Sequence, residues 1–417
     1  MVEPIRVGLL GLGTVGGGTL RVLTRNEREV TRRAGRPIRV SQICAHEFDV
    51  DAIGSALAGI EIVARPEDIV ANPNIDIVVE LFGGMEPAGS LMFEAIANGK
   101  HVVTANKALV ARRGNEIFKA ARKHGVMVNF EAAVGGGIPI IKALREGLGA
   151  NHIEWIVGII NGTGNFILTE MQHKGRTFDD VLLDAQILGY AEADPSFDIE
   201  GIDAAHKLAI LAAIAFGKPL QFDKVHTEGI TGITLEDVGY AEQLGYRIKH
   251  LGVARRTKAS VELRVHPTLI PKNRLIANVD GVMNAILVKG DAVGATLYYG
   301  AGAGSEPTAS AVVADLIDIT RVLTAPPENY VPHLAFQPDA IEDIPILPMS
   351  KVETAYYLRM RVADRPGVLA DVARVFGERD IGIEAVLQKQ LSTGAMDMPL
   401  IMLTRQVDEG RMLDAIA

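Results

Sequence analysis

Nearly continuous apolar runs that alternate with helical patterns dominate the first third of the chain. Five of these runs predict buried strands: IRVGLL, IRVSQICA, IDIVVELF, HVVTA and VMVNFEA. Segments with helical spacing lie between them: VGGGTLRVLTRNEREV, PAGSLMFEAIANGK and KALVARRGNEIFKAARKHG. Strands that are apolar along their whole length are typical of a parallel sheet covered on both faces. The pattern therefore predicts a doubly wound α/β domain.

The glycine loop GLGTVG follows the first predicted strand and opens the first helix. In a Rossmann-type domain the first glycine permits the turn, the second lets a pyrophosphate approach, and the third lets helix and strand pack closely. The helix N-terminus adds free N–H groups and a partial positive charge. We therefore predict that NAD or NADP binds here, while a tight turn in a cofactor-free domain is the alternative. The predicted cofactor contacts are Gly11, Leu12, Gly13, Thr14, Val15 and Gly16.

The choice between NAD and NADP depends on the residues that follow the second predicted strand. Glu47 can accept hydrogen bonds from a ribose diol, and His46 can face a 2′-phosphate. No arginine stands beside them, so the sequence leaves the cofactor preference open.

Length and composition limit the class of protein. A chain of 417 residues exceeds one hydrophobic core, which predicts two or three domains. The formal net charge of −9 gives no support to nucleic-acid binding. The apolar runs are much shorter than a membrane span and the N-terminus lacks a signal-peptide pattern, so we expect a cytoplasmic protein with no membrane partner. The single cysteine, Cys44, argues against a disulfide scaffold or a zinc cluster.

The pattern changes after about residue 134, where HIEWIVGIIN predicts a strand before several helices and further short strands. The glycine loop GAGAGSEP then leads into a long helix that can return to cover the first domain, and a linker rich in proline and acids follows. The predicted division is a cofactor domain at 1–133 completed by helix 305–325, a second α+β domain at 134–304, a linker at 326–350 and a third unit at 351–417.

Two segments of the first domain place polar groups near the expected cofactor crevice. The motif TANK ends at Lys107 and starts a helix after a strand, so this lysine should lie near the nicotinamide or the substrate. A merely solvated lysine is disfavoured because it opposes the helix dipole. The motif EAAVGGGIPI, from Glu131, exposes carbonyl groups and one carboxylate. Such a loop suits either a cation site of hard oxygens or a glycine hinge between domains.

The stretch EADPSFDIEGIDAAHK leads several acids and one lysine into an apolar helix. Asp203 and Lys207 are four residues apart and share one helix face, a spacing that usually gives a weak surface ion pair. The following turns are apolar on every face, so these charges need a partner or a purpose. A lysine here can protonate an oxygen that gains negative charge, whereas zinc lacks its usual ligands. The nearby acids are expected in loop or capping roles, with Asp198 also able to shape the pocket: Asp194, Asp198 and Glu200.

Several motifs together resemble the homoserine dehydrogenase family. In order along residues 1 to about 325, they are GLGTVG, TANKAL, EAAVGGGIPI, NGTGNFIL, GYAEADPSFDIEGIDAAHKL and YYGAGAGSEPTASAVVADL. The tail YYLRMRVADRPGVLADVARVFGERDIGIEAVLQ resembles an ACT domain, a regulatory module of ferredoxin type. The resemblance implies NAD(P)H-dependent reduction of L-aspartate 4-semialdehyde to L-homoserine in threonine and methionine synthesis. It also implies a homodimer or homotetramer that assembles through the second domain.

The same resemblance implies roles for individual residues. The family's general acid–base lysine corresponds to Lys207, and its second active-site lysine, which also touches the cofactor, to Lys107. The implied substrate contacts are Glu192, Asp203 and the backbone of Gly189. The implied ligands of a monovalent cation, sodium or potassium, are Glu131, Val134, Gly136 and Ile138. The further implied cofactor contacts are Thr104 and Gly302.

The C-terminal tail predicts regulation. Its turn through Asp364, Pro366 and Gly367 resembles the turn with which ACT domains hold amino acids, so we expect feedback inhibition by L-threonine. A dimerisation module without a ligand is the alternative. After MPLIMLTR and the helix EGRMLDAIA the usual final strand is missing, which leaves effector binding open.

Two other functions fit parts of the sequence. A sensor protein would bind a cofactor and an amino acid without turnover, yet it has no need for a proton donor such as Lys207. A related oxidoreductase would act on another amino-acid aldehyde or alcohol. Oxidation of NAD(P)H measured with aspartate semialdehyde beside other aldehydes separates these functions.

Overall fold

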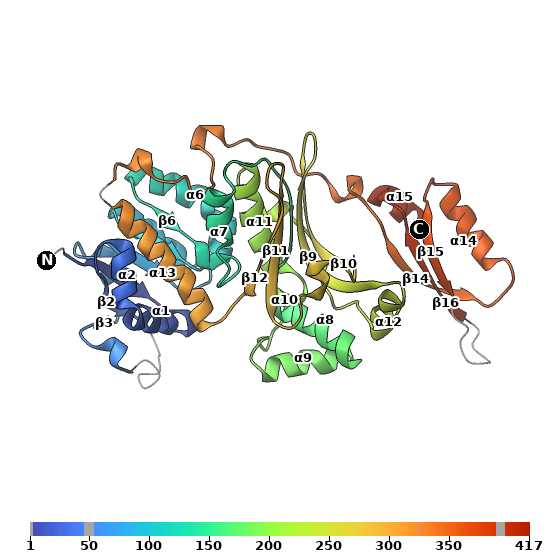
Figure 1. Cartoon of the computed structure of the whole chain (residues 1–417), viewed down its shortest axis with the longest axis horizontal. Coiled ribbons are helices and arrows are strands. Elements are labelled where there is room, and N and C mark those ends of the chain that lie inside the picture. The colour runs from blue at the N-terminus through green and yellow to red at the C-terminus, as the bar shows by residue number, and fades with distance from the viewer. Residues whose placement is uncertain (1–2, 46–53, 324, 389–396) are drawn as a thin grey trace.

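The computed structural model describes residues 3–45, 54–323, 325–388 and 397–417. Three groups of elements follow one another along the long axis, from the N-terminal sheet to the C-terminal unit (Figure 1). In the part of the chain that is described, every helix is too short or too polar to traverse a lipid bilayer.

The first group is a parallel sheet with the strand order β3-β2-β1-β4-β5-β6. Its strands are β1 (Ile5–Leu10), β2 (Ile38–Cys44), β3 (Glu61–Val63), β4 (Ile77–Glu80), β5 (His101–Thr104) and β6 (Val128–Asn129). The helices between them are α1 (Thr14–Arg25), α2 (Glu27–Ala34), α4 (Pro66–Ala71), α5 (Ala88–Ala97) and α6 (Lys107–His124). The doubly wound parallel sheet that the alternating apolar runs predict is therefore confirmed.

Some element boundaries in this sheet differ from the predicted ones. The helical pattern at 15–30 forms two helices, because Asn26 has a non-helical backbone conformation between α1 and α2. The run VMVNFEA gives only the two residues of β6 and then turns into a 3-10 helix at Glu131–Ala133. The apolar pattern does not reveal β3, because this edge strand has three residues and two of them are exposed.

The second group is a mixed sheet with the order β12-β11-β7-β9-β10-β8, in which only β8 and β10 pair in parallel. Its strands are β7 (Ile153–Ile159), β8 (His226–Thr227), β9 (Tyr246–Arg256), β10 (Val261–Pro271), β11 (Met283–Gly290) and β12 (Gly294–Ala301). The expectation of short strands here is wrong for β9 and β10, which pair over 11 residues each. Charged residues on one face of both strands interrupt the apolar pattern and hide their length.

This group also contains helices, several of which pack against the mixed sheet. They are α7 (Ile140–Lys142), which continues as a π-helix at Ala143–Gly147, α8 (Gly162–Lys174), α9 (Phe178–Ile187), α10 (Ser196–Ile199), α11 (Ile202–Phe216) and α12 (Leu235–Gln243). Every residue of α11 from Asp203 to Phe216 is buried, and this helix packs against α6 on one side and against β9 and β10 on the other. Both sheets therefore share one core across α11.

A long helix, α13 (Ser305–Val322), returns to pack on α1 and α2 of the first sheet (Figure 1). The start of α13 lies against the glycine loop, since the Ser305 hydroxyl donates to the Thr14 carbonyl at 2.6 Å. Short 3-10 helices also occur at Gly54–Leu57, Phe222–Lys224, Leu275–Asn278, Pro327–Asn329, Pro338–Ala340 and Met349–Lys351.

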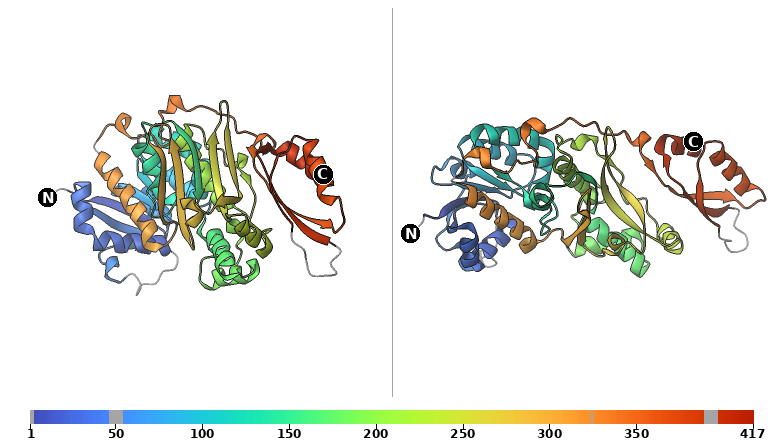
Figure 2. Two further views of the ribbon diagram at one scale, coloured as in Figure 1. Left: turned by 45° about the vertical axis from the view of Figure 1, so that its right-hand side comes forward. Right: turned by 45° about the horizontal axis from the view of Figure 1, so that its top comes forward.

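The third group is an antiparallel sheet with the order β14-β16-β15, beside a two-stranded pair of β13 and β17. Its elements are β13 (Glu353–Thr354), β14 (Tyr357–Ala363), α14 (Val368–Gly377), β15 (Ile383–Gln388), β16 (Asp397–Thr404), β17 (Val407–Asp408) and α15 (Glu409–Ile416). Figure 2 shows this unit at the end of the molecule away from the N-terminus. It docks on α12, where the Tyr357 hydroxyl donates to Asp237 at 2.8 Å.

Candidate active site

The acidic stretch and its lysine form a buried pair at the start of α11. The Lys207 Nζ atom donates to Asp203 Oδ2 at 2.6 Å and to the Ile160 carbonyl at 2.8 Å. Only 2% of Asp203 and 9% of Lys207 is exposed. The alternative of an ordinary surface ion pair is therefore wrong, because both charges lie inside the protein.

Lys107 reaches the same carboxylate from the first sheet. It is the first residue of α6, whose N-terminus is capped by the Asn106 side chain. Its Nζ atom lies 3.1 Å from Asp203 Oδ1, and its side chain is 34% exposed. One carboxylate therefore joins a deeply buried lysine to a second lysine that remains partly exposed.

Asn161 completes this cluster, although sequence reasoning gave it no role. Its Nδ2 group donates to Asp203 Oδ2 at 2.9 Å and to Asp198 Oδ1 at 2.7 Å, and its Oδ1 atom caps α8. An asparagine between a strand and a glycine-rich helix start, within NGTGNFIL, was the available signal. The nearby acids Asp194 and Glu200 accept hydrogen bonds from Ser196 and Thr231, respectively.

Burial and mutual contact shift the proton affinities of the central pair. Burial alone would raise the pKa of Asp203, but the ammonium groups of Lys207 and Lys107 hold that pKa well below its ordinary value. Burial lowers the pKa of Lys207, and Lys107 lowers it further, while Asp203 acts in the opposite direction. The Lys207 ammonium is therefore a stronger acid than an ordinary lysine, so it gives up a proton more readily.

The structure does not bring Glu192 into this cluster. Glu192 is exposed in the loop between α9 and α10, and its backbone carbonyl accepts a hydrogen bond from the Gln186 side chain at 3.1 Å. Gly189 lies in the same loop with a left-handed backbone, φ +74°. A hydrogen bond of 2.6 Å from the Thr163 hydroxyl to the Tyr190 carbonyl ties this loop to the first turn of α8. This hydrogen bond fixes the loop near the start of α8, two residues after Asn161. The Glu192 carboxylate has no partner among the described residues of the lysine cluster.

The predicted cofactor loop is open at Gly13, where a phosphate is expected, and tightly packed at Gly16, where the helix approaches the strand. Gly13 is exposed, and a Cβ atom there would meet nothing within 4 Å. A Cβ atom at Gly16 would lie 2.2 Å from the Gly11 carbonyl oxygen, so glycine is required at this approach of helix to strand. These are the features that a pyrophosphate-binding turn needs.

The other predicted cofactor contacts lie outside the glycine loop. The loop with Gly302 precedes α13, and a Cβ atom at Gly302 would lie 2.0 Å from the buried Asn284 side chain. Thr104 is fully buried and its hydroxyl donates to Glu80 at 2.7 Å, so its side chain is already engaged. The pair predicted to select NAD or NADP, His46 and Glu47, lies outside the described residues.

Glu131, the predicted cation ligand, lies in the 3-10 helix after β6, and its buried carboxylate meets the start of α7. Its two carboxylate oxygens accept from the backbone N–H groups of Ile141 and Lys142, at 2.8 Å each. Burial raises the pKa of Glu131 to about 7. Asp315 accepts from the Glu131 backbone N–H at 2.8 Å, and burial together with the Glu131 charge also raises the Asp315 pKa. The Ile138 carbonyl accepts from the Ile140 N–H at 2.8 Å. The Arg145 guanidinium lowers the pKa of both buried acids, so it already offsets part of their negative charge.

A dinucleotide-binding sheet with a glycine loop, beside a buried lysine–carboxylate–lysine cluster, defines an NAD(P)-dependent oxidoreductase. Comparison with protein families makes the assignment specific. The model described as homoserine dehydrogenase matches residues 139–317, and that of the homoserine dehydrogenase NAD-binding domain matches 11–131. The ACT domain model matches 356–417. The chain belongs to the homoserine dehydrogenase family.

Individual relatives agree along the whole chain. Homoserine dehydrogenase of Pseudomonas aeruginosa is 64% identical over 416 residues, which cover 100% of this chain and 95% of the relative. The crystal structure of a homoserine dehydrogenase from Thiobacillus denitrificans has a TM-score of 0.94 and 66% identity, over 99% of this chain and 94% of that one. A hyperthermophilic archaeal homoserine dehydrogenase in complex with NADPH has a TM-score of 0.64 and 28% identity, over 78% of this chain and 99% of that one.

These comparisons confirm three predictions made from the sequence. The chain is an NAD(P)-dependent enzyme of the homoserine dehydrogenase family, it has a nucleotide-binding domain, and its C-terminal unit is an ACT domain.

Proposed function

We propose that the chain reduces L-aspartate 4-semialdehyde to L-homoserine with NAD(P)H, at the junction of α6, α8 and α11. The buried contact of Asp203 with both Lys207 and Lys107 carries this proposal. A buried ion pair is expensive to maintain unless it serves a function, and this one lies beside the predicted cofactor crevice.

Lys207 is the proposed proton donor. A lysine ammonium has three N–H groups, and two of those of Lys207 are taken by Asp203 and by the Ile160 carbonyl. The third has no partner among the described residues and is proposed to face the aldehyde oxygen. NAD(P)H, held at the glycine loop, would supply a hydride to the aldehyde carbon. Lys207 is placed to stabilise the negative charge that develops on the aldehyde oxygen and to give that oxygen a proton. In the reverse direction the neutral Lys207 amine accepts the hydroxyl proton of homoserine.

Asp203 and Lys107 support this step. Asp203 fixes the Lys207 ammonium by a contact of 2.6 Å, and Asn161 in turn holds the carboxylate. Lys107, at the N-terminus of α6, is exposed enough to contact both substrate and cofactor. We assign the backbone of Gly189 and the carboxylate of Glu192 to the substrate, with Glu192 binding its α-ammonium.

The cofactor is proposed to lie over the glycine loop from Gly11 to Gly16. The open space at Gly13 and the α1 N-terminus support this placement, as does the adjacent α13 loop with Gly302. We propose both NAD and NADP as cofactors, and the NADPH in the archaeal relative supports the second.

A monovalent cation, sodium or potassium, is proposed at the Glu131 loop. The chemistry of the donors fits, because a hard cation prefers oxygen ligands and the loop offers a carboxylate with backbone carbonyls. The raised pKa of Glu131 supports it further, since a bound cation would stabilise the ionised carboxylate. The proposed ligands are Glu131, Val134, Gly136 and Ile138.

Regulation and assembly complete the proposal. L-threonine is proposed to inhibit the enzyme through the ACT domain, at the turn of Asp364, Pro366 and Gly367. A homodimer or homotetramer is proposed to form through the second sheet. The face of that sheet turned away from α11 supports this assembly, since it carries partly buried Leu287 and Leu297 and the 58% exposed Tyr299.

One set of rates tests the reaction. NAD(P)H oxidation is measured with L-aspartate 4-semialdehyde, with succinate semialdehyde, which lacks the amino group, and with butanal. We expect turnover with the first and a large loss of kcat/KM with the others. Equal rates with all three would favour a less selective aldehyde reductase, and no turnover with any would favour a sensor.

A further inference from the structure

A stack of three aromatic rings contacts the lysine cluster through Lys107. The His206 ring lies on that of Phe222, with the ring centroids 4.0 Å apart and an angle of 7° between the planes. Phe197 also stacks on His206, with centroids 5.5 Å apart and an angle of 27°. The rings come from three elements: Phe197 from α10, His206 from α11 and Phe222 from the 3-10 helix that follows. We call these three residues the ring stack.

Helix α6 places a cation at each outer ring of the stack. The Lys107 Nζ atom is 5.7 Å from the centroid of the Phe197 ring, and the Arg112 guanidinium carbon is 4.6 Å from that of Phe222. A cation within about 6 Å of an aromatic centroid is attracted by the negative face of the ring. Both cations belong to the first group of elements, whereas the rings belong to the second. The ring stack therefore contacts α6 at two positions, and one of them is the second active-site lysine.

The middle ring is neutral and is hydrogen-bonded to the same helix. Arg112 Nε donates to His206 Nε2 at 3.3 Å, so Nε2 carries no proton and the neutral ring holds its proton on Nδ1. Burial, and after it the Arg112 guanidinium, lower the pKa of His206 to about 4. Only 1% of His206 is exposed, so the packing around the ring fixes its position. The neutral ring can lie between two cations without adding a third positive charge.

Phe197 is the link between the stack and Lys107. It belongs to α10, a helix of only four residues, and 39% of it is exposed, so its ring depends on His206 for support. Lys107 has one ion-pair partner among the described residues, Asp203, and a lysine side chain is long and flexible. A single contact of this kind leaves the ammonium able to swing away from the carboxylate. The Phe197 ring supplies a second attractive contact, which restricts that motion.

We propose that His206 and Phe197 are positioning residues, which hold the Lys107 ammonium against Asp203 at the reacting centre. His206 fixes the ring of Phe197, and Phe197 in turn restricts Lys107. Both residues act on the reaction through Lys107. The inference rests on the function proposed above, in which Lys107 contacts substrate and cofactor, and it extends the site to two aromatic residues of the second group of elements.

Chemical labelling of lysines reports the surroundings of Lys107 without any turnover. The full chain is acetylated with a limiting amount of acetic anhydride in the absence of substrate, and each modified peptide is quantified by mass spectrometry. Phe197→Leu and His206→Leu should each raise the labelling rate of Lys107 by about two- to fivefold, because the ammonium loses a cation–π contact that covers and stabilises it. Lys119, which is exposed on the same helix, is the internal control and should be labelled at the parent rate.

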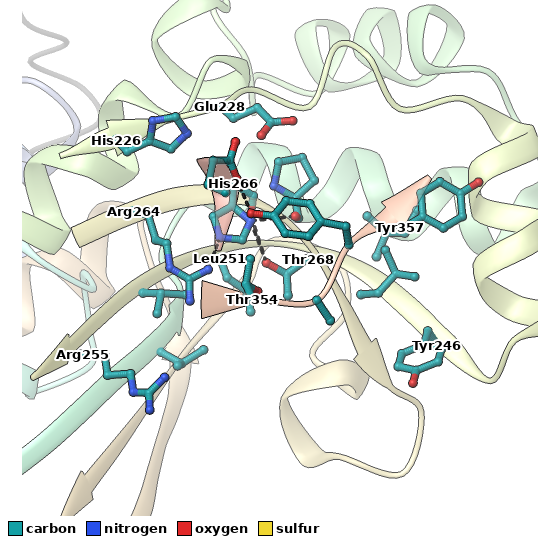
Figure 3. A pocket seen from close by; sticks show the side chains of 18 of the residues that line it. His226, Glu228, Tyr246, Leu251, Arg255, Arg264, His266, Thr268, Thr354 and Tyr357 are labelled. Atoms are coloured by element: carbon teal, nitrogen blue, oxygen red, sulfur yellow. Dashed lines mark hydrogen bonds between the residues drawn. The ribbon is translucent and has the colours of Figure 1, made fainter. Parts of the chain in front are cut away.

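Two further variants separate the ring stack from a general loss of packing. His206→Phe keeps a ring for stacking but cannot accept from Arg112, so its Lys107 should be labelled like that of the parent. Tyr246→Leu removes a partly buried ring at a cavity of about 920 Å³ between the second sheet and the ACT domain (Figure 3). No residue of the lysine cluster or of the ring stack lines this cavity, so Tyr246→Leu should leave the labelling of Lys107 unchanged. The melting temperature shows whether each variant folds, and the partly exposed Phe197 keeps the test available if His206→Leu does not.

A double-mutant cycle tests whether Phe197 acts on the reaction through Lys107. The kcat/KM for L-aspartate 4-semialdehyde is measured in the parent, in Phe197→Leu, in Lys107→Ala and in the double variant. Phe197→Leu should lower kcat/KM by about two- to fivefold when Lys107 is present. It should have no further effect once Lys107 is alanine, because the contact that it removes is already lost.

Three results would overturn the proposal. The first is unchanged labelling of Lys107 in folded Phe197→Leu. The second is an equal rise of Lys107 labelling in Tyr246→Leu or in His206→Phe, which would mean that loosened packing rather than ring stacking exposes the lysine. The third is a double variant in which the two losses of kcat/KM multiply, because Phe197 would then act independently of Lys107. Failure of the proposed function is distinguishable, since the parent would then not reduce the aldehyde while the labelling still reports whether the ring stack holds Lys107.

Discussion

Replacing Asp203 with asparagine tests how the lysine cluster works. The amide keeps the shape of the side chain but removes the only charge that contacts both Lys207 and Lys107 among the described residues. Lys207 is 9% exposed, so solvent cannot replace the lost partner. Burial already lowers the Lys207 pKa, and without Asp203 that pKa must fall further.

The size of the effect follows from the distance between the charges. Two unit charges about 4 Å apart interact by about 4 kcal/mol at an effective dielectric constant of about 20. One pKa unit corresponds to about 1.4 kcal/mol, so an interaction of this size corresponds to a shift of about three units. The amide dipole and local relaxation recover part of this energy, and we expect a decrease of at least about one unit.

The pH dependence of hydride transfer measures this decrease. Reduction requires the protonated lysine, so the alkaline limb of its rate should move to lower pH in Asp203→Asn. Oxidation of homoserine requires the neutral amine, so its acidic limb should move in the same direction. Asp198→Asn is the matched control, because Asp198 accepts from the same Asn161 amide but forms no ion pair with a described lysine. Limbs that stay in place in Asp203→Asn, or that move equally in both variants, would refute the reasoning.

Three further predictions follow from the site. Gly13→Val should fold and lose cofactor affinity, since a Cβ atom there has no neighbour within 4 Å. Gly16→Val should lower the melting temperature, because its Cβ atom would lie 2.2 Å from the Gly11 carbonyl oxygen. Normal cofactor affinity in folded Gly13→Val would contradict the cofactor site. Because the pKa of Glu131 is raised from 4.5 to about 7, ionising it costs stability as pH rises through that range, so sodium or potassium should raise the melting temperature more at about pH 8 than at about pH 5. Glu131→Gln should lose this pH-dependent effect, and an unchanged cation response in that variant would exclude the site. L-threonine should inhibit turnover of the full chain and leave Gly367→Val, altered in the ACT turn, less sensitive; full activity of the parent at saturating threonine would contradict regulation.

Much of the fold could be predicted from local patterns. The parallel sheet follows from strands that are apolar along their whole length, and the glycine loop marks the turn from β1 into α1. The lengths of β9 and β10 could not be predicted, because Lys249 and Arg264 break the apolar pattern although both lie buried in the sheet. Lys249 is buried against Asp280, and Arg264 is buried against His266. The spacing of residues along the chain does not predict either contact.

The candidate site, like the fold, could be predicted from local sequence patterns only in part. Helical spacing places Asp203 and Lys207 on one face, and the apolar turns after them indicate burial. The approach of Lys107 to the same carboxylate depends on how α6 packs on α11, so position along the chain alone could not predict it. The contacts of Asn161 could not be predicted for the same reason, since its two acidic partners lie 37 and 42 residues away in the sequence. The carboxylate of Glu192 has no partner among the described residues, and its proposed role rests on the motif alone.

The turnover of Lys207→Ala with L-aspartate 4-semialdehyde and NADPH tests the central claim most directly. Removal of a general acid–base group should lower kcat by about 10²- to 10⁴-fold. Cofactor affinity should stay close to that of the parent, because Lys207 contacts Asp203 and Ile160 rather than the glycine loop. A variant that turns over within a few-fold of the parent would show that Lys207 is only an ion-pair partner, and Lys107 would then be the proton donor.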